Sequence, residues 1–439
     1  MSTLSNSVFV DLVRSFPAWT ELSDHLRSAE GGNLTIYSVP NSHLAMIHYN
    51  RQRSSFAVPH VGAFRSVVWD TTANRPVSVT PFKSESGEVF EFRADPFPVL
   101  VPGSAFNLVN AGVFRAESFE DGVMIGQFWD ADTQSWRIHT RSTLDASANF
   151  FSKRSFADLW SDVKDKPAEA DLDKSVCYSW ILSHPENRVG CTVGKPSVRL
   201  VGQVRVNAED GAIAAIGRDE TAEPLKKFLP CYLNTFRIVQ DADGNNLNPV
   251  MNAVLGMLKV LNTSADNQGL VFVSEENPFR RWKVRTGTYN KIRQMRGNSP
   301  RLDFHWMDLW SKGQLAEYLK FFPEERAAAT ALVNKWKDVS SVAYRMYADV
   351  FKSRVVPKES IPAKFRPLVY ALHSHYMSVL RPARKSLDWN TTVRFLNERD
   401  TAQKIYVLNW DLRGSPASAA SAVTATADTA TADTAAATA

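Results

Sequence analysis

The sequence predicts an α+β protein, in which a domain of antiparallel sheets with flanking helices is followed by an all-α C-terminal domain. Short aromatic and β-branched runs, separated by polar turns, recur over residues 33–302 and are typical of strands. From Asp303 to Asp400 apolar residues return at helical spacing instead. The length of 439 residues suits two to three domains with a large core.

A proline and changes in composition along the chain indicate the domain boundaries. Pro17 separates two amphipathic pieces, Ser7–Phe16 and Ala18–Ala29, that predict helices. After Leu412 an Ala/Thr-rich tract with an ATADT repeat lacks aromatic residues, so we expect it to be disordered. The predicted parts are an N-terminal helical segment over 1–32, the sheet domain over 33–302, the helical domain over 303–413 and the tail over 414–439.

Two hairpins are the clearest local predictions of the sheet domain. Leu34–Val39 and Leu44–Tyr49 flank a short turn that contains proline. Gly122–Trp129 and Gln134–Thr140 flank Asp130-Ala-Asp-Thr, which predicts a second hairpin with a polar turn. An acidic turn leads into this second hairpin, and we expect the chemistry of the protein to be located there.

The composition excludes several classes of protein. Hydrophobic content of 44% and charged content of 22% are ordinary for a globular chain, and no apolar run is long enough to span a membrane. The N-terminus does not resemble a signal peptide, so we expect an intracellular protein of the cytoplasm or of a nucleoid-like compartment of a host cell. Cys177, Cys191 and Cys231 lack metal-ligand spacing, which predicts free thiols and no metal site.

Basic residues are concentrated in two stretches. Residues 277–301 hold eight Lys and Arg and no acid, and residues 351–394 hold nine against two acids. A solvated face is the simple interpretation, but aromatic residues among the cations favour contact with phosphates and bases of RNA. The predicted RNA-binding residues of the first stretch are Arg280, Arg281, Trp282, Tyr289, Lys291, Arg293 and Arg296.

A series of short motifs carries the functional prediction. Glu120-Asp121-Gly122 opens the central hairpin and Thr140-Arg141-Ser142 closes it. The others, in chain order, are Arg65-Ser-Val-Val-Trp-Asp70, Pro81-Phe-Lys83, Pro185-Glu-Asn-Arg188, Gln268-Gly-Leu-Val271 and Lys283-Val-Arg285. In order and spacing they resemble the RNA ligase family of covalent nucleotidyltransferases, in its phage RNA ligase and fungal tRNA ligase branch.

The resemblance covers residues 33–300 and implies a nucleotidyltransferase domain, an ATP-grasp-like ligase fold. In this family the amine of a lysine attacks the α-phosphate of ATP and forms lysyl-AMP. Phe119 occupies the place of that lysine, and Ile181 and Gln268 occupy the places of two catalytic glutamates. These three degenerate positions predict that no catalytic residue remains.

The motif positions that suit phosphate binding are retained. Lys283 and Arg285 alternate with apolar residues along a predicted strand, so both cations lie on one face. A solvated strand end is the alternative for the other cations. By resemblance, the nucleotide- or phosphate-binding residues are Arg65, Lys83, Asp121, Gly122, Arg141, Lys283 and Arg285.

Three functions follow from these patterns. The first is an RNA ligase-like protein without catalysis that binds RNA, a nucleotide or both through a cationic cleft. The second is an active ATP-dependent RNA ligase that seals RNA ends, with ATP and Mg as cofactors. The third is a structural or assembly protein, with protein partners at the helical domain. The family branch suggests a viral or phage setting, by analogy alone.

Overall fold

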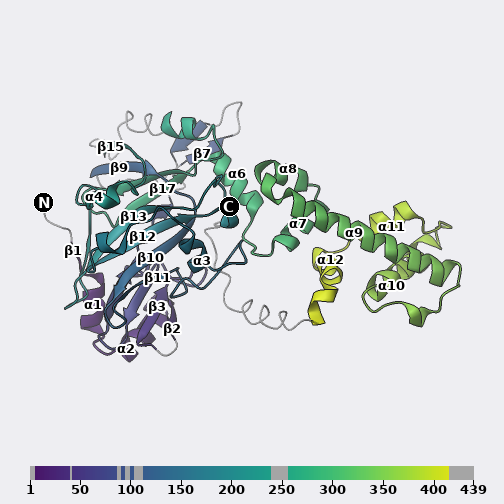
Figure 1. The fold of residues 1–439 in the computed structure, drawn as a ribbon, viewed down its shortest axis with the longest axis horizontal. Coiled ribbons are helices and arrows are strands. Elements are labelled where there is room, and N and C mark those ends of the chain that lie inside the picture. The colour runs from purple at the N-terminus through teal and green to yellow at the C-terminus, as the bar shows by residue number, and fades with distance from the viewer. Residues whose placement is uncertain are drawn as a thin grey trace. The chain divides into compact units, whose positions relative to one another are not determined.

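The computed structural model describes residues 5–39, 42–86, 90–93, 99–102, 112–238 and 256–414. The chain divides into two units, Met1–Gln294 and Met295–Ala439 (Figure 1). The first holds the sheets and the second is helical, which confirms the predicted α+β class with an all-α C-terminal part. Residues 415–439 of the predicted tail lie outside the described residues.

A six-stranded antiparallel sheet forms the centre of the first unit. The predicted central hairpin is present in it, with Asp130 opposite Ser135 across the turn. Asp130 Oδ1 accepts backbone N–H groups of Asp132 and Thr133, and Gln134 completes the turn with φ +51°. In spatial order the strands are β1 (Ser5–Asn6), β14 (Ile213–Ala215), β13 (Ser197–Val206), β12 (Val176–Ser183), β10 (Val123–Asp130) and β11 (Ser135–His139).

The N-terminal helices share a core with a four-stranded antiparallel sheet. Helices α1 (Val8–Ser15) and α2 (Trp19–Arg27) match the two predicted pieces on either side of Pro17. Phe9 of α1 packs edge-on against Phe64 and Trp69, and all three are fully buried. Both helices lie beside this sheet in Figure 1. Its strands are β2 (Thr35–Ser38), β3 (Leu44–His48), β4 (Val67–Asp70) and β5 (Arg75–Val79), so the first predicted hairpin is confirmed.

A five-stranded sheet completes the described strands, apart from the pair β7 (Phe90–Arg93) and β8 (Val99–Pro102). Its order is β15 (Tyr232–Ile238), β9 (Gly112–Ser118), β16 (Gly269–Ser274), β17 (Arg281–Arg285) and β6 (Glu85–Ser86), with only β6 paired in parallel. One face carries an apolar core that includes Phe114, Leu270 and Trp282. Because side chains alternate, Lys283 and Arg285 project from the opposite face.

Short helices fill the connections of the first unit. Ser155 begins α3 (Phe156–Ser161) with a capping box, since its hydroxyl accepts the N–H of Asp158 and the Asp158 carboxylate accepts its own N–H. The others are α4 (Glu223–Lys226) and α6 (Gly287–Arg296), which ends at the boundary with the second unit. The sequence predictions contained no helix over 287–296.

The second unit is built on the 22-residue helix α9 (Arg326–Tyr347). Buried residues recur along one side of α9, among them Val333, Trp336 and Tyr347. The helices around it are α7 (Leu302–Ser311), α8 (Leu315–Phe321), α10 (Arg366–His375), α11 (Trp389–Asn397) and α12 (Thr401–Leu408). One-turn π-helices, η6 (Ala348–Lys352) and η8 (Tyr376–Leu380), extend α9 and α10.

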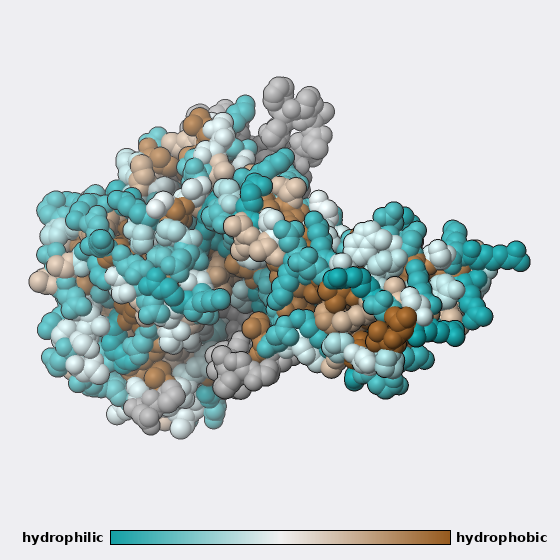
Figure 2. Space-filling model, turned by 45° about the vertical axis from the view of Figure 1, so that its right-hand side comes forward, coloured by the Kyte–Doolittle hydropathy of each residue, from teal (hydrophilic) through white to brown (hydrophobic). Residues whose placement is uncertain are grey.

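Hydrophobic side chains are also exposed on this unit. Val355, Met377 and Val379 are 71%, 42% and 52% exposed. Figure 2 shows hydrophobic side chains in groups on the helical unit, whereas the sheet unit is mainly hydrophilic on the face drawn. In the described part of the chain, no helix has the length and hydropathy needed to span a membrane.

Candidate functional site

Six cations from five parts of the first unit lie within electrostatic range of others in the group, and we call them the cation cluster. Two come from β17 and one from α6, and three come from loops next to β3, β4 and β11. Positive charges of other members contribute to the lowered pKa of Arg51, Arg141, Lys283 and Arg285. The members are Arg51, Arg65, Arg141, Lys283, Arg285 and Arg293.

Lys283 is the most perturbed member. Its side chain is on β17, where the backbone pairs with Val271 of β16, and it is only 8% exposed. Burial, together with the charges of Arg285, Arg65, Arg51 and Arg293, lowers the pKa of Lys283 to about 6. The amine is therefore largely neutral at pH 7 in the absence of an anion.

The arginines of the cluster keep their charge at neutral pH. Burial lowers the pKa of Arg285 to about 10, and the charge of Arg293 adds to this shift. Burial likewise lowers the pKa of Arg141 to about 10, with Arg65 and Arg51 acting in the same direction against Tyr49. Partly buried charges of one sign repel one another, and such groups favour the binding of an anion.

A hydrogen bond between the residues next to Arg65 and Arg141 holds these two segments together. Ser66, which stands in place of the family's glycine, donates its hydroxyl to the carbonyl of Thr140 at 3.1 Å. Arg141 donates to the carbonyl of Tyr49, and its guanidinium lies 4.5 Å from the centre of the Tyr49 ring. Among the described residues, Arg141 Nε is buried with no hydrogen-bond partner, so one donor of the cluster remains available.

Phe119 lies on the same face of the five-stranded sheet as the cluster. Its backbone N–H donates to the carbonyl of Gly269 at 3.0 Å, and its ring centre is 5.1 Å from the Arg285 guanidinium. Gly269, whose carbonyl pairs with Phe119, has φ +143°, and a Cβ there would lie 1.9 Å from the carbonyl oxygen of Val284. The Phe119 ring therefore lies beside Arg285 on the face of the sheet that carries Lys283 and Arg285.

Ile181 and Gln268, the positions at which the resemblance implies glutamates, also lie near residues 119–122. Ile181 of β12 packs against Gly122, where a Cβ would lie 2.9 Å from Ile181 Cγ2 and 2.3 Å from the carbonyl of Leu182. Gly122 has φ +151°, so both space and conformation require glycine. Gln268 is 6% exposed, and its backbone carbonyl accepts the N–H of Thr286.

Asp121 has a structural role in the hydrogen-bond network. Its Oδ1 accepts the hydroxyl of Tyr289 at 2.6 Å, and its Oδ2 accepts the N–H groups of Gly190 and Cys191 at 2.9 and 2.8 Å. Three donors therefore hold this carboxylate. The motif turn is fixed to the loop after Pro185-Glu-Asn-Arg188, in which the Arg188 side chain donates to carbonyls of Gly190 and Cys191.

The predicted RNA-binding stretch divides into accessible and buried residues. Lys291 is exposed, and Arg280 is half-buried with its guanidinium 4.6 Å from the Trp282 ring. Trp282 and Tyr289 are 8% and 1% exposed, so neither ring is presented to a base. Arg296 is 2% exposed and forms an ion pair with Glu325.

These positions correct the expectation for three residues. Trp282, Tyr289 and Arg296 belong to packed interiors, and we do not include them in an RNA surface. Arg281 donates to the carbonyls of Pro278 and Val201, and burial lowers its pKa to about 10. Lys83 lies beside the cluster, with its ammonium 4.7 Å from the Phe56 ring, which in turn contacts Tyr49.

The sequence predictions missed Arg51 and Tyr49. The basic segment Asn50-Arg-Gln-Arg follows the end of a predicted strand, which could have indicated a binding loop. It is not part of any motif that carries the resemblance. Burial and the charges of Arg65 and Arg293 lower the pKa of Arg51, whereas Tyr49 raises it. Only the fold brings this loop against β17 and α6.

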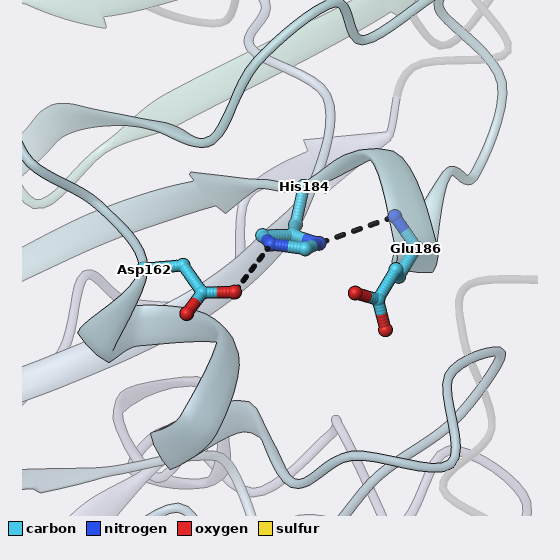
Figure 3. A group of neighbouring side chains, drawn as sticks. All are labelled: Asp162, His184 and Glu186. Carbon is cyan, nitrogen blue, oxygen red and sulfur yellow. Dashed lines mark hydrogen bonds and ion pairs between the residues drawn. The ribbon is translucent and has the colours of Figure 1, made fainter.

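A second cluster, Asp162, His184 and Glu186, has metal-ligand geometry but is internally satisfied (Figure 3). His184 Nδ1 accepts the N–H of Glu186 at 3.1 Å, so Nε2 carries the proton and donates to Asp162 at 3.3 Å. Arg154 bridges both carboxylates at 2.7 and 3.1 Å. Because neither histidine nitrogen has a spare lone pair, these residues stabilise the Pro185–Asn187 turn (η4) and do not fit a metal.

Comparisons with known proteins relate the chain distantly to ligases. It is 21% identical over 272 residues to an RNA ligase of Rhodothermus phage RM378, a match that spans 56% of this chain and 60% of the phage protein. No family model matches. Among solved structures, it is similar to a putative ATP-dependent DNA ligase from Aquifex aeolicus (TM-score 0.39, 14% identity, 82% of this chain and 80% of that one).

An archaeal ATP-dependent RNA ligase gives a TM-score of 0.38 at 9% identity, with 88% of this chain and 97% of that one covered. These TM-scores and identities indicate weak structural similarity. The sequence match to the phage RNA ligase supports a relation to the ligases, as the motifs predicted. It leaves the activity of this chain to be argued from its own residues.

Proposed function

We propose that the chain is an RNA ligase-like protein that binds RNA, a nucleotide or both at the cation cluster without catalysing ligation. The observation that carries this proposal is the Phe119 ring beside Arg285, among cations that repel one another. A phenyl ring has no lone pair with which to attack phosphorus. The cations that would neutralise phosphate charge are nevertheless assembled.

The carboxylates near the site support binding over catalysis. Asp121 is held by three donors, and Glu117 accepts from Arg115 at 2.7 Å and from Arg218 at 3.0 Å. Ile181 and Gln268 provide no carboxylate. These residues do not fit a Mg²⁺ site, which needs carboxylate and water oxygens in octahedral geometry.

Labelling tests the loss of catalysis. The full chain is incubated with α-³²P-ATP and Mg²⁺ or Mn²⁺ and then analysed by denaturing electrophoresis. We expect no label on the protein, with an active RNA ligase as the positive control. A covalent adenylate that survives denaturation would contradict the proposal.

RNA retention tests the binding site. We expect retention of single-stranded RNA on filters to fall as salt rises, because bound phosphates release counterions. Arg65→Ala together with Arg285→Ala should weaken retention by more than about tenfold, since each charged hydrogen bond is worth roughly 1.5–3 kcal/mol. Lys195→Ala, at an exposed lysine of the same unit, is the matched control and should leave retention unchanged.

Equal retention by the double variant and the control would place RNA elsewhere. It would favour the structural or assembly role, in which the fold serves protein partners. The half-buried Arg280 and the exposed Lys291 would be tested next, since both lie near β17 in the sequence.

An active ATP-dependent RNA ligase is the second candidate, and Lys283 is the observation that favours it. Burial brings the pKa of this amine to about 6, so it is neutral and nucleophilic at pH 7. If the labelling experiment yields an adenylate, peptide mapping should find it on Lys283, and Lys283→Arg should abolish it. Absence of label rejects this candidate.

A further inference from the structure

Aromatic side chains of three helices meet on one part of the helical unit. Helices α9, α10 and α11 pack against one another (Figure 1). Tyr344, Tyr347 and Phe351 lie along one side of α9 and its extension η6, because they are three and four residues apart. The Tyr344 ring centre is 5.7 Å from that of Trp389, the first residue of α11. The Phe351 ring meets Tyr370 of α10 edge-on, with 6.5 Å between ring centres.

Two lysines lie close to these rings. Lys352 Nζ is 5.3 Å from the centre of the Tyr344 ring and 5.9 Å from that of Tyr347. The Tyr347 ring is in turn 5.7 Å from that of Phe351, and Lys358 Nζ is 5.5 Å from the Phe351 ring. Printed side by side, these contacts connect one group of accessible side chains, which we call the ring row. Its members are Tyr344, Phe351, Tyr370, Trp389, Lys352 and Lys358.

The ends of the ring row are open to solvent. Tyr370 and Trp389 are 43% and 41% exposed, and both lysines are exposed. Tyr344 and Phe351 are half-buried. Tyr347, which is 1% exposed, belongs to the core beneath them. Large rings that gather at the surface beside cations are typical of a surface that binds a partner.

The chain around the ring row is strongly basic. Residues 351–394 contain nine Lys and Arg and two acids. Eight of the nine cations are exposed, and the ninth, Lys364, pairs with Asp411 at 2.5 Å. The two acids are Glu359 and Asp388, and Asp388 caps α11. The excess of positive charge fits a partner with many negative charges.

Rings beside cations favour one kind of polyanion. A single nucleic-acid strand brings a base with a π-face for every phosphate, so rings stack on bases while lysines contact phosphates. In a duplex the bases are paired and stacked on each other, and their faces are not available. An anionic lipid surface instead takes up a broad apolar face. The ring row does not provide such a face, because a lysine lies over the Tyr344 ring and another over the Phe351 ring.

We propose that the ring row binds single-stranded RNA, with bases stacked on Tyr370 and Trp389 and phosphates beside Lys352 and Lys358. The inference goes beyond the proposed function, because it concerns a surface of the other unit. Only the choice of RNA over DNA rests on the proposed function. Helices that pack together hold the rings in place, so few side chains need to be ordered when the strand binds.

Ring variants test the stacking. Binding of a fluorescein-labelled decauridylate to the full chain is measured by fluorescence anisotropy. We expect Tyr370→Ala and Trp389→Ala each to weaken binding by about fivefold or more, the effect of losing one stacked base. Trp389→Phe keeps a ring and should bind nearly as the wild type does. Tyr406→Ala is the matched control, since Tyr406 is 40% exposed on α12 of the same unit, and it should leave binding unchanged.

Salt dependence and cross-linking test the contact independently. Lys358→Gln should reduce the slope of log Kd against log salt concentration by about 0.7, the value for one phosphate of a single strand. Lys320→Gln, at an exposed lysine of α8, should leave the slope unchanged. Photo-cross-linking of the wild type to an oligonucleotide that contains 5-iodouracil needs no variant. We expect the cross-links on peptides that contain Tyr370 or Trp389.

The outcomes separate this inference from the proposed function. Affinity that neither alanine variant lowers, with cross-links confined to the first unit, overturns the inference and leaves the cation cluster as the RNA site. Affinity that falls in the ring variants but not in Arg65→Ala with Arg285→Ala supports the ring row and overturns the cluster as that site. If Tyr406→Ala weakens binding equally, the inference is overturned.

A lipid partner is tested with vesicles of phosphatidylserine and phosphatidylcholine. Cosedimentation of the wild type that Trp389→Ala abolishes, together with no binding of decauridylate, would identify a lipid surface and overturn the inference. We expect RNA binding without cosedimentation.

Discussion

Buried cations occur in both units, and they are arranged in opposite ways. In the helical unit Arg296 pairs with Glu325, which also accepts from Tyr318 and Trp306 at 2.6 and 2.7 Å. In the sheet unit, burial and the charges of neighbouring arginines lower the pKa of Lys283 and of Arg285. The paired arrangement stabilises the fold. The like-charged arrangement destabilises it, and such an arrangement is retained where a ligand offsets the cost.

The largest expected effect comes from breaking the paired arrangement. Glu325→Leu leaves the Arg296 charge buried without its carboxylate, and removes the acceptor of Tyr318 and Trp306. We expect the free energy of unfolding to fall by about 3–5 kcal/mol, measured by urea denaturation. A loss below about 1 kcal/mol would show that Arg296 finds water and would weaken the comparison.

The contact between Tyr289 and Asp121 should be worth less. Tyr289→Phe removes a buried hydroxyl that donates to a carboxylate, while the ring still packs on Gly190. We expect a loss of about 1.5–3 kcal/mol in the free energy of unfolding, as for other hydrogen bonds to charged groups. RNA retention should persist in this variant. Unchanged stability would mean that the two N–H donors of the 190–191 loop suffice for Asp121.

The like-charged arrangement should show itself in the pH dependence of stability. The pKa of Lys283 is about 6 in the fold, below the ordinary value of about 10.4 in an unfolded chain. Between these values the unfolded chain binds one more proton, so this residue makes stability rise with pH by at most about 1.4 kcal/mol per unit. Below pH 6 the full penalty is present.

Lys283→Met removes this contribution. The variant should be more stable than the wild type near pH 6, and the advantage should shrink steadily toward pH 10. Urea denaturation at pH 6, 7, 8 and 9 measures the difference between the two proteins, so that other titrating groups cancel. A constant difference across this range would mean that Lys283 stays charged in the fold.

The smallest effect is expected at an exposed pair of the helical unit. Lys312 and Asp308 are 2.7 Å apart and one helical turn from each other, at 59% and 31% exposure. Lys312→Ala should cost no more than about 0.5 kcal/mol, because water screens such a pair. A cost comparable to that of Glu325→Leu would show that burial is not what distinguishes the two ion pairs.

Local patterns were enough to predict much of the fold. The hairpin around Asp130 and the helices on either side of Pro17 follow from period-two and helical spacing, which neighbouring residues alone define. Helix α6 escaped prediction because its sequence Gly287–Arg296 is largely polar, and its strongly buried residues Tyr289, Ile292 and Arg296 include only one aliphatic side chain. The many basic residues of that stretch predicted RNA binding instead of a helix.

The candidate site shows where sequence reasoning ends. Alternation along β17 placed Lys283 and Arg285 on one face, and the motifs named Arg65 and Arg141. The inclusion of Arg51 and Arg293, the burial of Trp282 and the hydrogen bond from Tyr289 to Asp121 depend on segments far apart in the chain, 168 residues in the case of Tyr289 and Asp121. Patterns among neighbouring residues contain no information on contacts between such distant segments.

The sequence by itself determined the alternation of strands, the helical C-terminal part and the presence of a phenyl ring at Phe119, because these are properties of neighbouring residues and of residue identity. The tertiary structure decided which cations are paired and which repel one another. Burial and the dielectric environment set that difference, and both arise only when distant segments pack together.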